Sequence, residues 1–192
     1  MGQLRAIRTL NALQQGTLSS AQLETLLTTG SQLGEWSGLM QSQGQCNRLA
    51  ASSTAMTAVA ASSTARLSFW NSDPALTAAA GSSAALAAFR AAPGYAVNSF
   101  AENNGDGTLS TISNMATSNA KWILVGWSRS STTGNAYISS ASRRSGSAVG
   151  TLSGNPVSGS TAAANNVMAL IGPATAYCDT ISRTVYFGVL PV

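Results

Sequence analysis

Apolar and polar positions recur every ten residues between Gln32 and Ala91. The four clearest copies begin at Ser52, Ser62, Ser72 and Ser82. Their fifth and eighth positions hold the pairs Met56/Val59, Arg66/Phe69, Leu76/Ala79 and Leu86/Phe89, and two degenerate copies continue the phase backwards with Trp36/Leu39 and Cys46/Leu49. An internal repeat indicates stacked units, so this half of the chain is expected to build a scaffold rather than a pocket.

The period of ten does not fit one continuous helix. Ten residues advance an ideal helix by about 1000°, so each copy would turn roughly 80° from the one before and spread its apolar pairs around the cylinder. Pro74 occupies the place of Thr54 and Thr64, and a helix accepts proline only in its first turn. The pattern therefore predicts short helices of about seven residues, capped by the Ser-Ser-Thr segments and held by neighbours. Alanine at the fourth position of each clear copy predicts close backbone approach there.

Two helices are predicted before the repeat. The first covers residues 1–15, is closed by Gly16, and places four apolar residues along one side: Leu4, Ile7, Leu10 and Leu13. The second begins at a capping box formed by Ser19 and Gln22, with Leu18 and Leu23 in the positions of a hydrophobic staple, and runs to about residue 29.

Composition changes at Pro93, where glycine, serine, asparagine and threonine begin to dominate and short β-type runs appear between turns. Strands are predicted at residues 108–112, 121–129, 135–142, 166–171 and 183–190, with an additional one near 174–178. The expected fold is α+β, with an array of short helices over residues 1–92 and an antiparallel β-sandwich or barrel over residues 93–192.

Two of these strands are apolar on both faces, at residues 122–127 and 185–190. A sheet with one face in water should alternate polar and apolar residues, so each strand is expected inside a sandwich or against another subunit. Together with the repeat, this pattern nominates eight residues for subunit interfaces: Met56, Val59, Phe69, Leu76, Leu86, Phe89, Trp122 and Trp127. For the tryptophans, packing in a core is favoured over stacking on sugars.

The composition also favours assembly. The chain of 192 residues is 44% hydrophobic and only 8% charged, whereas ordinary soluble domains carry about 25% charge. Such a surface suits packing against copies of the chain, where charges are costly to bury. The net charge of +4 is spread thinly over both halves, so no nucleic-acid partner is expected. A solvated pair is the favoured interpretation of Arg143 and Arg144, with a phosphate contact as the alternative.

Segments that would direct the chain to a membrane are not recognised. No apolar run is long enough to cross a bilayer, and the first thirteen residues are amphipathic, unlike a signal peptide. Cys46 and Cys178 lie in dissimilar regions, so two reduced, buried thiols are preferred to a disulfide.

Catalytic chemistry is sparse. The chain has no histidine, which excludes the usual Ser-His-Asp and Cys-His systems. With only two cysteines, a zinc site would need carboxylates as well, unlike the typical zinc ligand sets. Glu102 and Asp106 form one close carboxylate pair, for which a turn is favoured over a cation site or catalysis. The loops at residues 130–134 and 145–159 are candidates for a recognition surface or simple connections. No enzyme activity, cofactor or metal is expected.

The residues that carry a resemblance are Leu49-Ala-Ala-Ser-Ser-Thr-Ala-Met-Thr-Ala-Val-Ala-Ala-Ser-Ser-Thr-Ala65. They resemble decapeptide arrays of tailed-bacteriophage structural proteins, although Arg66, Phe69 and Trp70 depart from that pattern. The resemblance implies a virion component of fibre or decoration type, made in the host cytoplasm, whose partners are its own copies in a homotrimer and other virion proteins. A carbohydrate-binding tailspike-type protein that contacts a host surface glycan, and a surface adhesin, are the alternatives.

Overall fold

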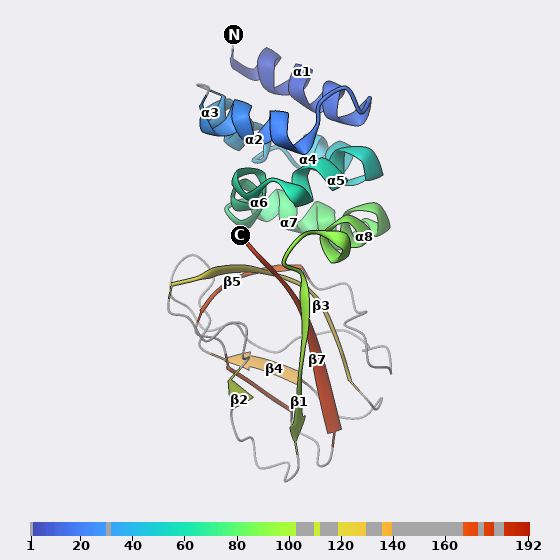
Figure 1. The fold of residues 1–192 in the computed structure, drawn as a ribbon, viewed down its shortest axis with the longest axis vertical. Helices are drawn as coiled ribbons and strands as arrows, with labels where there is room; N and C mark the ends of the chain where they lie inside the picture. Colours follow the sequence, from blue (N-terminus) through green and yellow to red (C-terminus); the bar gives the residue numbers. More distant parts are fainter. Residues whose placement is uncertain are drawn as a thin grey trace. The chain divides into compact units, whose positions relative to one another are not determined.

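A computed structural model of the chain describes residues 2–29, 32–102, 110–111, 119–129, 136–139, 167–172, 175–178 and 183–192. The chain divides into two compact units, Met1–Gly94 and Tyr95–Pro191. The division falls next to Pro93, where the change in composition placed the domain boundary. The first unit is helical and the second is built from strands, so the α+β class is confirmed (Figure 1).

Eight helices are described in the first unit (Figure 1). They are α1 (Gly2–Gln14), α2 (Ser20–Thr28), α3 (Leu33–Leu39), α4 (Gln43–Ala50), α5 (Ser53–Ala61), α6 (Ser63–Trp70), α7 (Asp73–Ala80) and α8 (Ser83–Ala91). From α4 onward each helix corresponds to one copy of the ten-residue repeat. The prediction of a series of short helices is therefore confirmed.

The ends of the first two helices form as their sequences predict. Gly16 has a φ of 71° and lies just beyond α1, where its N–H donates to the Leu13 carbonyl at 3.1 Å. This left-handed conformation is the one that favours glycine after a helix. At α2, Ser19 and Gln22 form the predicted capping box, with the Ser19 N–H donating to Gln22 Oε1 at 2.8 Å and the Gln22 N–H donating to Ser19 Oγ at 3.3 Å.

The first serine of each clear copy caps the helix that follows it. The hydroxyl oxygens of these serines accept a hydrogen bond from the backbone N–H three residues on, at 3.1–3.2 Å, in the pairs Ser52/Ala55, Ser62/Ala65, Ser72/Ala75 and Ser82/Ala85. Each bond satisfies one backbone donor that a helix start leaves without an intrahelical partner. Pro74 lies in the first turn of α7, where its missing N–H costs nothing. Both features were predicted.

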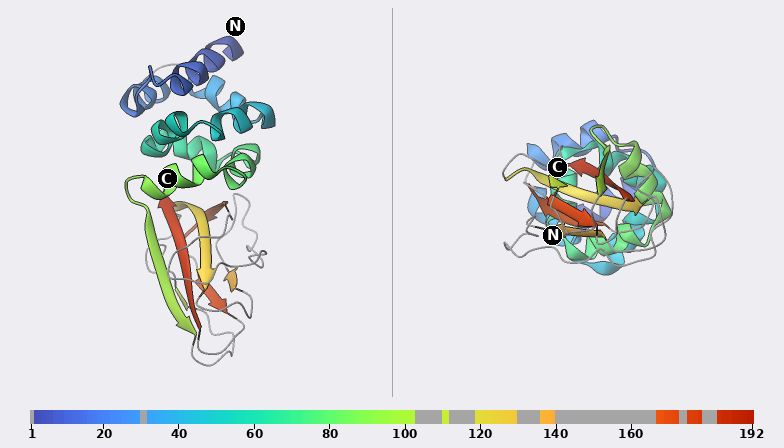
Figure 2. Two further views of the ribbon diagram at one scale, coloured as in Figure 1. Left: turned by 90° about the vertical axis from the view of Figure 1, so that its right-hand side faces the viewer. Right: turned by 90° about the horizontal axis from the view of Figure 1, so that it is seen from below.

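The helices coil into a solenoid in which α4 packs on α7 and α5 packs on α8, so the main contacts of the repeat join helices that are three apart. Thirty residues therefore make one coil, and the helices appear as stacked layers in Figure 2. Ser82 Oγ donates to the Ala50 carbonyl at 2.5 Å, and Ser72 Oγ donates to the Met40 carbonyl. These two serines thus accept a bond within their own helix and donate one to the preceding coil.

The interior of the solenoid is filled from three positions of the repeat. The alanines at the fourth position, Ala55, Ala65, Ala75 and Ala85, are all fully buried. The fifth and eighth positions are buried as well, and the rings of Phe69 and Phe89 pack edge to face with centroids 5.7 Å apart. Phe69 and Phe89 lie twenty residues apart in the sequence, so this contact joins the second and fourth clear copies. The apolar positions of the repeat are therefore the buried positions of this unit, and the chain's own helices cover them.

The strands of the second unit form two sheets (Figure 1). A four-stranded antiparallel sheet has the order β1 (Ala96–Glu102), β7 (Arg183–Pro191), β3 (Lys121–Arg129) and β5 (Met168–Ile171). A three-stranded antiparallel sheet has the order β2 (Ser110–Thr111), β6 (Thr175–Cys178) and β4 (Ala136–Ser139). The four-stranded sheet is open, with β1 and β5 at its edges, so the antiparallel class is confirmed but neither a barrel nor a sandwich is shown.

The two central strands, β3 and β7, are apolar on both faces as expected. Ile123, Leu124 and Val125 are consecutive in β3 and have no exposed surface, which places both faces of that strand in a core. In β7 the adjacent Val189 and Leu190 are equally buried. The pairing of the two strands shifts register between Leu124 and Gly126, an irregularity typical of a β-bulge.

One strand was not predicted from the sequence. β1 pairs with β7 over its full length, from Ala96 opposite Val189 to Glu102 opposite Arg183. Its Val97 is 44% exposed while Asn98 is buried, so its alternation is the reverse of the usual one, and alanine, asparagine and glutamate are poor strand formers. Backbone pairing with a distant strand therefore decides its conformation.

Candidate functional site

Seven of the eight residues nominated for subunit interfaces lie in the chain's own core. The exposed fraction is 3% or less for all of these: Met56, Val59, Phe69, Leu76, Leu86, Phe89 and Trp127. Their side chains have almost no surface left to offer a second subunit, so the interface assignment is wrong for them. The physical reason is that a coil of thirty residues supplies within one chain the neighbours that each short helix needs. Trp122 is half-buried, and its assignment stays a prediction.

Glu24 on α2 organises the start of α6. Its carboxylate accepts hydrogen bonds from Ser62 Oγ and Thr64 Oγ1 at 2.5 Å, and from Ser63 Oγ and the Thr64 N–H at 3.1 Å. Burial alone would raise the pKa of Glu24, but these bonds favour the charged form and lower it from 4.5 to about 2. A carboxylate at the N-terminus of a helix is also favoured by the helix dipole.

Arg66 takes the fifth position of its copy, where the other clear copies carry methionine or leucine. Its side chain is buried, and Nη1 donates to the Ala60 carbonyl at 2.6 Å. Burial lowers the pKa of Arg66, and the charge of Glu24 opposes that effect. The Glu24 carboxylate therefore does two structural tasks, because it caps one helix and compensates a buried cation. Its four donors leave it saturated and unsuited to proton transfer.

Cys46 is a buried free thiol that donates to the Met40 carbonyl at 3.2 Å. Burial raises its pKa to about 11, against a smaller opposing effect of the Ser72 hydroxyl. Such a thiol is a packing group and a poor nucleophile. Within the described ranges no three residues among His, Cys, Asp and Glu gather to hold a metal ion.

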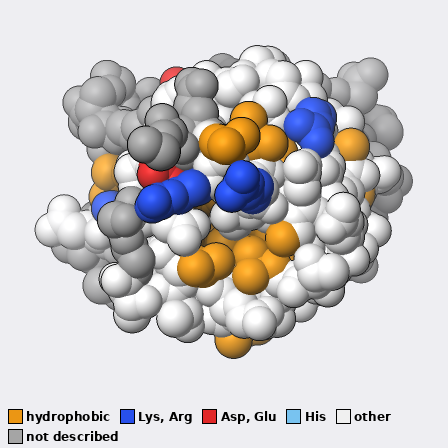
Figure 3. All heavy atoms as spheres, turned by 90° about the horizontal axis from the view of Figure 1, so that it is seen from above, with side chains coloured by type: hydrophobic (Ala, Val, Ile, Leu, Met, Phe, Trp, Pro, Cys, Tyr) orange, Lys and Arg blue, Asp and Glu red, His pale blue; other side chains and the backbone are white. Residues whose placement is uncertain are grey.

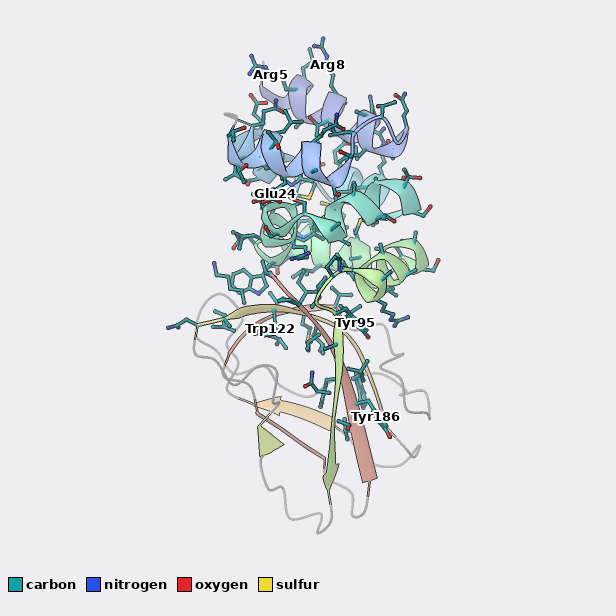
Figure 4. All side chains as sticks on the ribbon, in the orientation of Figure 1. Arg5, Arg8, Glu24, Tyr95, Trp122 and Tyr186 are labelled. Carbon is teal, nitrogen blue, oxygen red and sulfur yellow. The ribbon has the colours of Figure 1, made fainter. Side chains whose placement is uncertain are left out.

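The N-terminal end of the solenoid combines exposed apolar and cationic side chains. Leu4 on α1 is 56% exposed and Leu33 on α3 is 42% exposed, and these two helices pack on each other. Arg5 and Arg8 project away from the helices beneath them (Figure 4) and are exposed. Neither guanidinium makes a hydrogen bond or ion pair with a described residue. In Figure 3 the cationic side chains at this end lie between two hydrophobic areas.

This end surface was missed from the sequence. The spacing of Leu4, Ile7, Leu10 and Leu13 predicted one buried side of a helix, but only Leu10 and Leu13 are fully buried, while Leu4 is exposed and Ile7 is half-buried. The available signal was the position of Leu4 and Ile7 among Arg5 and Arg8. Cations next to the outer half of an apolar stripe indicate that this half reaches the surface of the molecule.

Several predicted site residues cannot be placed. Asp106, the Arg143-Arg144 pair and the loops at residues 130–134 and 145–159 lie outside the described residues, as do the side chains of Glu102 and Cys178.

Neither a membrane-spanning helix in the described residues nor a match to a known protein family is found. No helix in the part of the chain that the structure describes has the length and apolar character to span a bilayer. No protein-family model matches the chain, and no curated protein is found to match it.

Proposed function

We propose that this chain is a non-enzymatic structural component of a tailed-phage virion, of fibre or decoration type. The helical unit anchors it on the particle, and the β unit, proposed as an antiparallel sandwich or barrel, serves as the distal part. The resemblance of the ten-residue repeat to phage structural proteins supplies the class of particle. The observation that carries the anchoring role is the exposed N-terminal end of the solenoid.

That end has the composition of a docking surface. Terminal units of a solenoid need a polar outer face to remain soluble alone, but here Leu4 and Leu33 are exposed. Arginine is enriched at protein interfaces, where it combines charge with apolar contact area. Arg5 and Arg8 therefore favour a partner surface with apolar and acidic groups. The same charges would repel if two copies met end to end, so the anchoring partner is another virion protein.

The roles of the ionisable groups described in the helical unit support the non-enzymatic proposal. With no histidine in the chain, the ionisable groups best defined in the helical unit are Glu24, Arg66 and Cys46, and each is used to hold helices together. The proposal includes a homotrimer. Trp122 is the one residue nominated for its interface that is not fully buried in its own chain.

Incorporation into purified phage particles tests the anchoring role. The double variant Leu4→Ser/Leu33→Ser, and separately Arg5→Glu/Arg8→Glu, should reduce the amount of protein per particle at least tenfold while leaving the melting temperature of the free protein unchanged. Val97→Ser is the matched control, because Val97 is 44% exposed but lies in β1. Full incorporation of both double variants would overturn the anchoring role, and absence of the wild-type protein from particles would overturn the virion assignment. A monomer at micromolar concentration would overturn the trimer.

A host-recognition protein that binds a surface glycan is the second candidate. Trp127 is 1% exposed and has no face to offer a sugar, whereas Trp122 is half-buried and keeps this candidate open. The double variant Glu102→Gln/Asp106→Asn, together with Trp122→Ala, should abolish glycan binding or cleavage if this candidate is correct.

A further inference from the structure

A groove of about 560 Å³ lies in the helical unit between α4, α7 and the beginning of α8, the helices labelled in Figure 1. Four of its lining residues have exposed polar side chains: Gln43, Asn47, Thr77 and Ser83. All residues of its lining are uncharged. The volume lies within the range of small-molecule sites, about 300–1,000 Å³, and a ligand can reach all four polar side chains from solvent.

Two side-chain amides in this groove hold each other in a fixed orientation. Gln43 Nε2 donates to Asn47 Oδ1 at 2.8 Å and to the Pro74 carbonyl at 3.2 Å. Both donors of the Gln43 amide are therefore used, and its Oε1 atom is left to accept. Asn47 takes the opposite role, because its oxygen is occupied and its Nδ2 atom keeps two donors that no described residue accepts. The groove thus presents an acceptor and a donor on neighbouring side chains.

Two hydroxyls of the groove are also available, although their equivalents in the repeat are engaged. Thr57 holds the same repeat position as Thr77 and donates to a backbone carbonyl of its own helix at 2.8 Å. Ser63 holds the same position as Ser83 and donates to the Glu24 carboxylate at 3.1 Å. The hydroxyls of Thr77 and Ser83 make no hydrogen bond with a described residue. Each can therefore donate to a ligand and accept from it.

The remaining lining decides which class of ligand fits. A charged ligand would find no opposite charge there, because the lining carries none. Peptides gain most of their affinity from a few large side chains that fill pockets, but the polar groups here are separated only by small residues such as Ala51 and Gly81. A shallow surface of this kind suits a flat ligand with polar groups around its edge. Hydroxyls match the available groups best, because each hydroxyl both donates and accepts.

We propose that this groove binds a neutral saccharide. One sugar hydroxyl donates to Gln43 Oε1 and accepts from Asn47 Nδ2, and further hydroxyls bond to Thr77 and Ser83. The carbon-bound face of the ring lies against the small residues of the lining. This inference does not rest on the proposed virion role. It also places a sugar site in the helical unit, whereas the residues considered above for a host glycan belong to the β unit.

Titration of the full chain with maltose, cellobiose and lactose tests the site by two-dimensional NMR. At least one of these disaccharides should give saturable shifts in α4, α7 and the beginning of α8, including the side-chain amide signals of Gln43 and Asn47. Asn47→Asp keeps an acceptor for Gln43 but removes both donors, so it should weaken binding at least tenfold. Thr77→Ala should weaken binding severalfold. Thr57→Ala is the matched control, at the same repeat position outside the groove, and should bind normally.

Gly81 allows the groove to be blocked without strain. Its φ is −85°, and a Cβ added there would meet its nearest atom, the Ala78 carbonyl oxygen, at an ordinary contact of 3.8 Å. Gly81→Leu should therefore abolish saturable binding while the melting temperature stays close to wild type.

Three outcomes would overturn the saccharide site. They are no saturable shift with any of the three disaccharides, unchanged binding in both Asn47→Asp and Gly81→Leu, and tighter binding of the peptide acetyl-Ala-Ala-Ala-amide than of every disaccharide. The last result would identify the groove as a peptide site. The incorporation of these variants into phage particles reads the anchoring role separately, because the groove residues are not part of the N-terminal end surface.

Discussion

The helical and β units of this chain bring their neighbours together over different distances in the sequence. In the helical unit α4 packs on α7 and α5 on α8, so contacts repeat at about one coil of thirty residues. In the four-stranded sheet Ala96 lies opposite Val189, and most of the β unit separates these partners in the sequence. The helical unit follows one local rule many times, and the sheet depends on a few distant pairings.

Because of this difference, a substitution affects the stability of the two units in different ways. In a solenoid the stability is close to a sum of unit and neighbour terms, so a degenerate copy such as the one around Cys46 is accommodated by its neighbours. In the sheet β7 pairs with both β1 and β3, so a fault in this one strand affects two pairings. Sequence-distant pairing also makes folding slower in general.

The largest expected effect comes from removing a ring from the solenoid interior. Phe69→Ala should lower the free energy of unfolding by about 3–5 kcal/mol, because Phe69 is fully buried and packs on Phe89. Denaturant unfolding followed by circular dichroism measures this loss. Thr77→Ala, on an exposed position of α7, should change stability by less than about 0.5 kcal/mol. Equal losses in the two variants would contradict the assignment of the repeat's eighth position to the core.

A smaller effect is expected from the repeated serine, and it tests the local rule directly. Ser72→Ala removes the bond that caps α7 and the bond to the Met40 carbonyl of the preceding coil. The loss should be about 1–3 kcal/mol. Ser42→Ala is the matched control, because Ser42 makes no capping bond, and it should cost less than about 0.5 kcal/mol. A similar loss at both serines would show that the two bonds of Ser72 contribute nothing beyond the residue type.

The smallest effect on stability is expected at Glu24, which precedes the repeat in the sequence and accepts hydrogen bonds from the start of α6. The pKa of Glu24 is lowered in the folded chain from 4.5 to about 2, so its contribution to stability is complete above pH 4.5 and is lost as the pH falls towards 2. After allowance for solvent screening, the contribution is about 1–2 kcal/mol. Unfolding of wild type and Glu24→Gln should differ by this amount at pH 7 and converge near pH 2. Parallel pH profiles would contradict the role of the carboxylate.

The helical unit could be predicted in most of its local features. Ser52 and its equivalents identified the caps, Pro74 identified the first turn of α7, and the spacing of Met56 and Val59 identified buried positions. These features depend on residues three or four apart, which a sequence displays directly. The same apolar spacing led to a wrong interface assignment. It shows that one side of a helix is apolar, but it does not show whether that side is covered by the same chain or by another subunit.

Other features depend on distant partners and could not be predicted. The exposed Val97 and buried Asn98 of β1 reverse the expected alternation, and only pairing with β7 explains them. The bonds between Glu24 and residues 62–64 join positions about forty residues apart, and no ten-residue pattern contains them. The exposure of the Leu4 side chain depends on how α1 packs on α3. The sequence of α1 alone does not contain that information.

Because three helices make one coil, the number of repeat copies determines the length of the solenoid and the direction in which the chain leaves it. Insertion of one ten-residue copy would turn the direction in which the chain leaves the solenoid by about a third of a revolution. Insertion of three copies would restore that direction and add one layer of helices. Duplication in steps of thirty residues could therefore lengthen the helical unit during evolution while its last helix kept the same orientation towards whatever follows it.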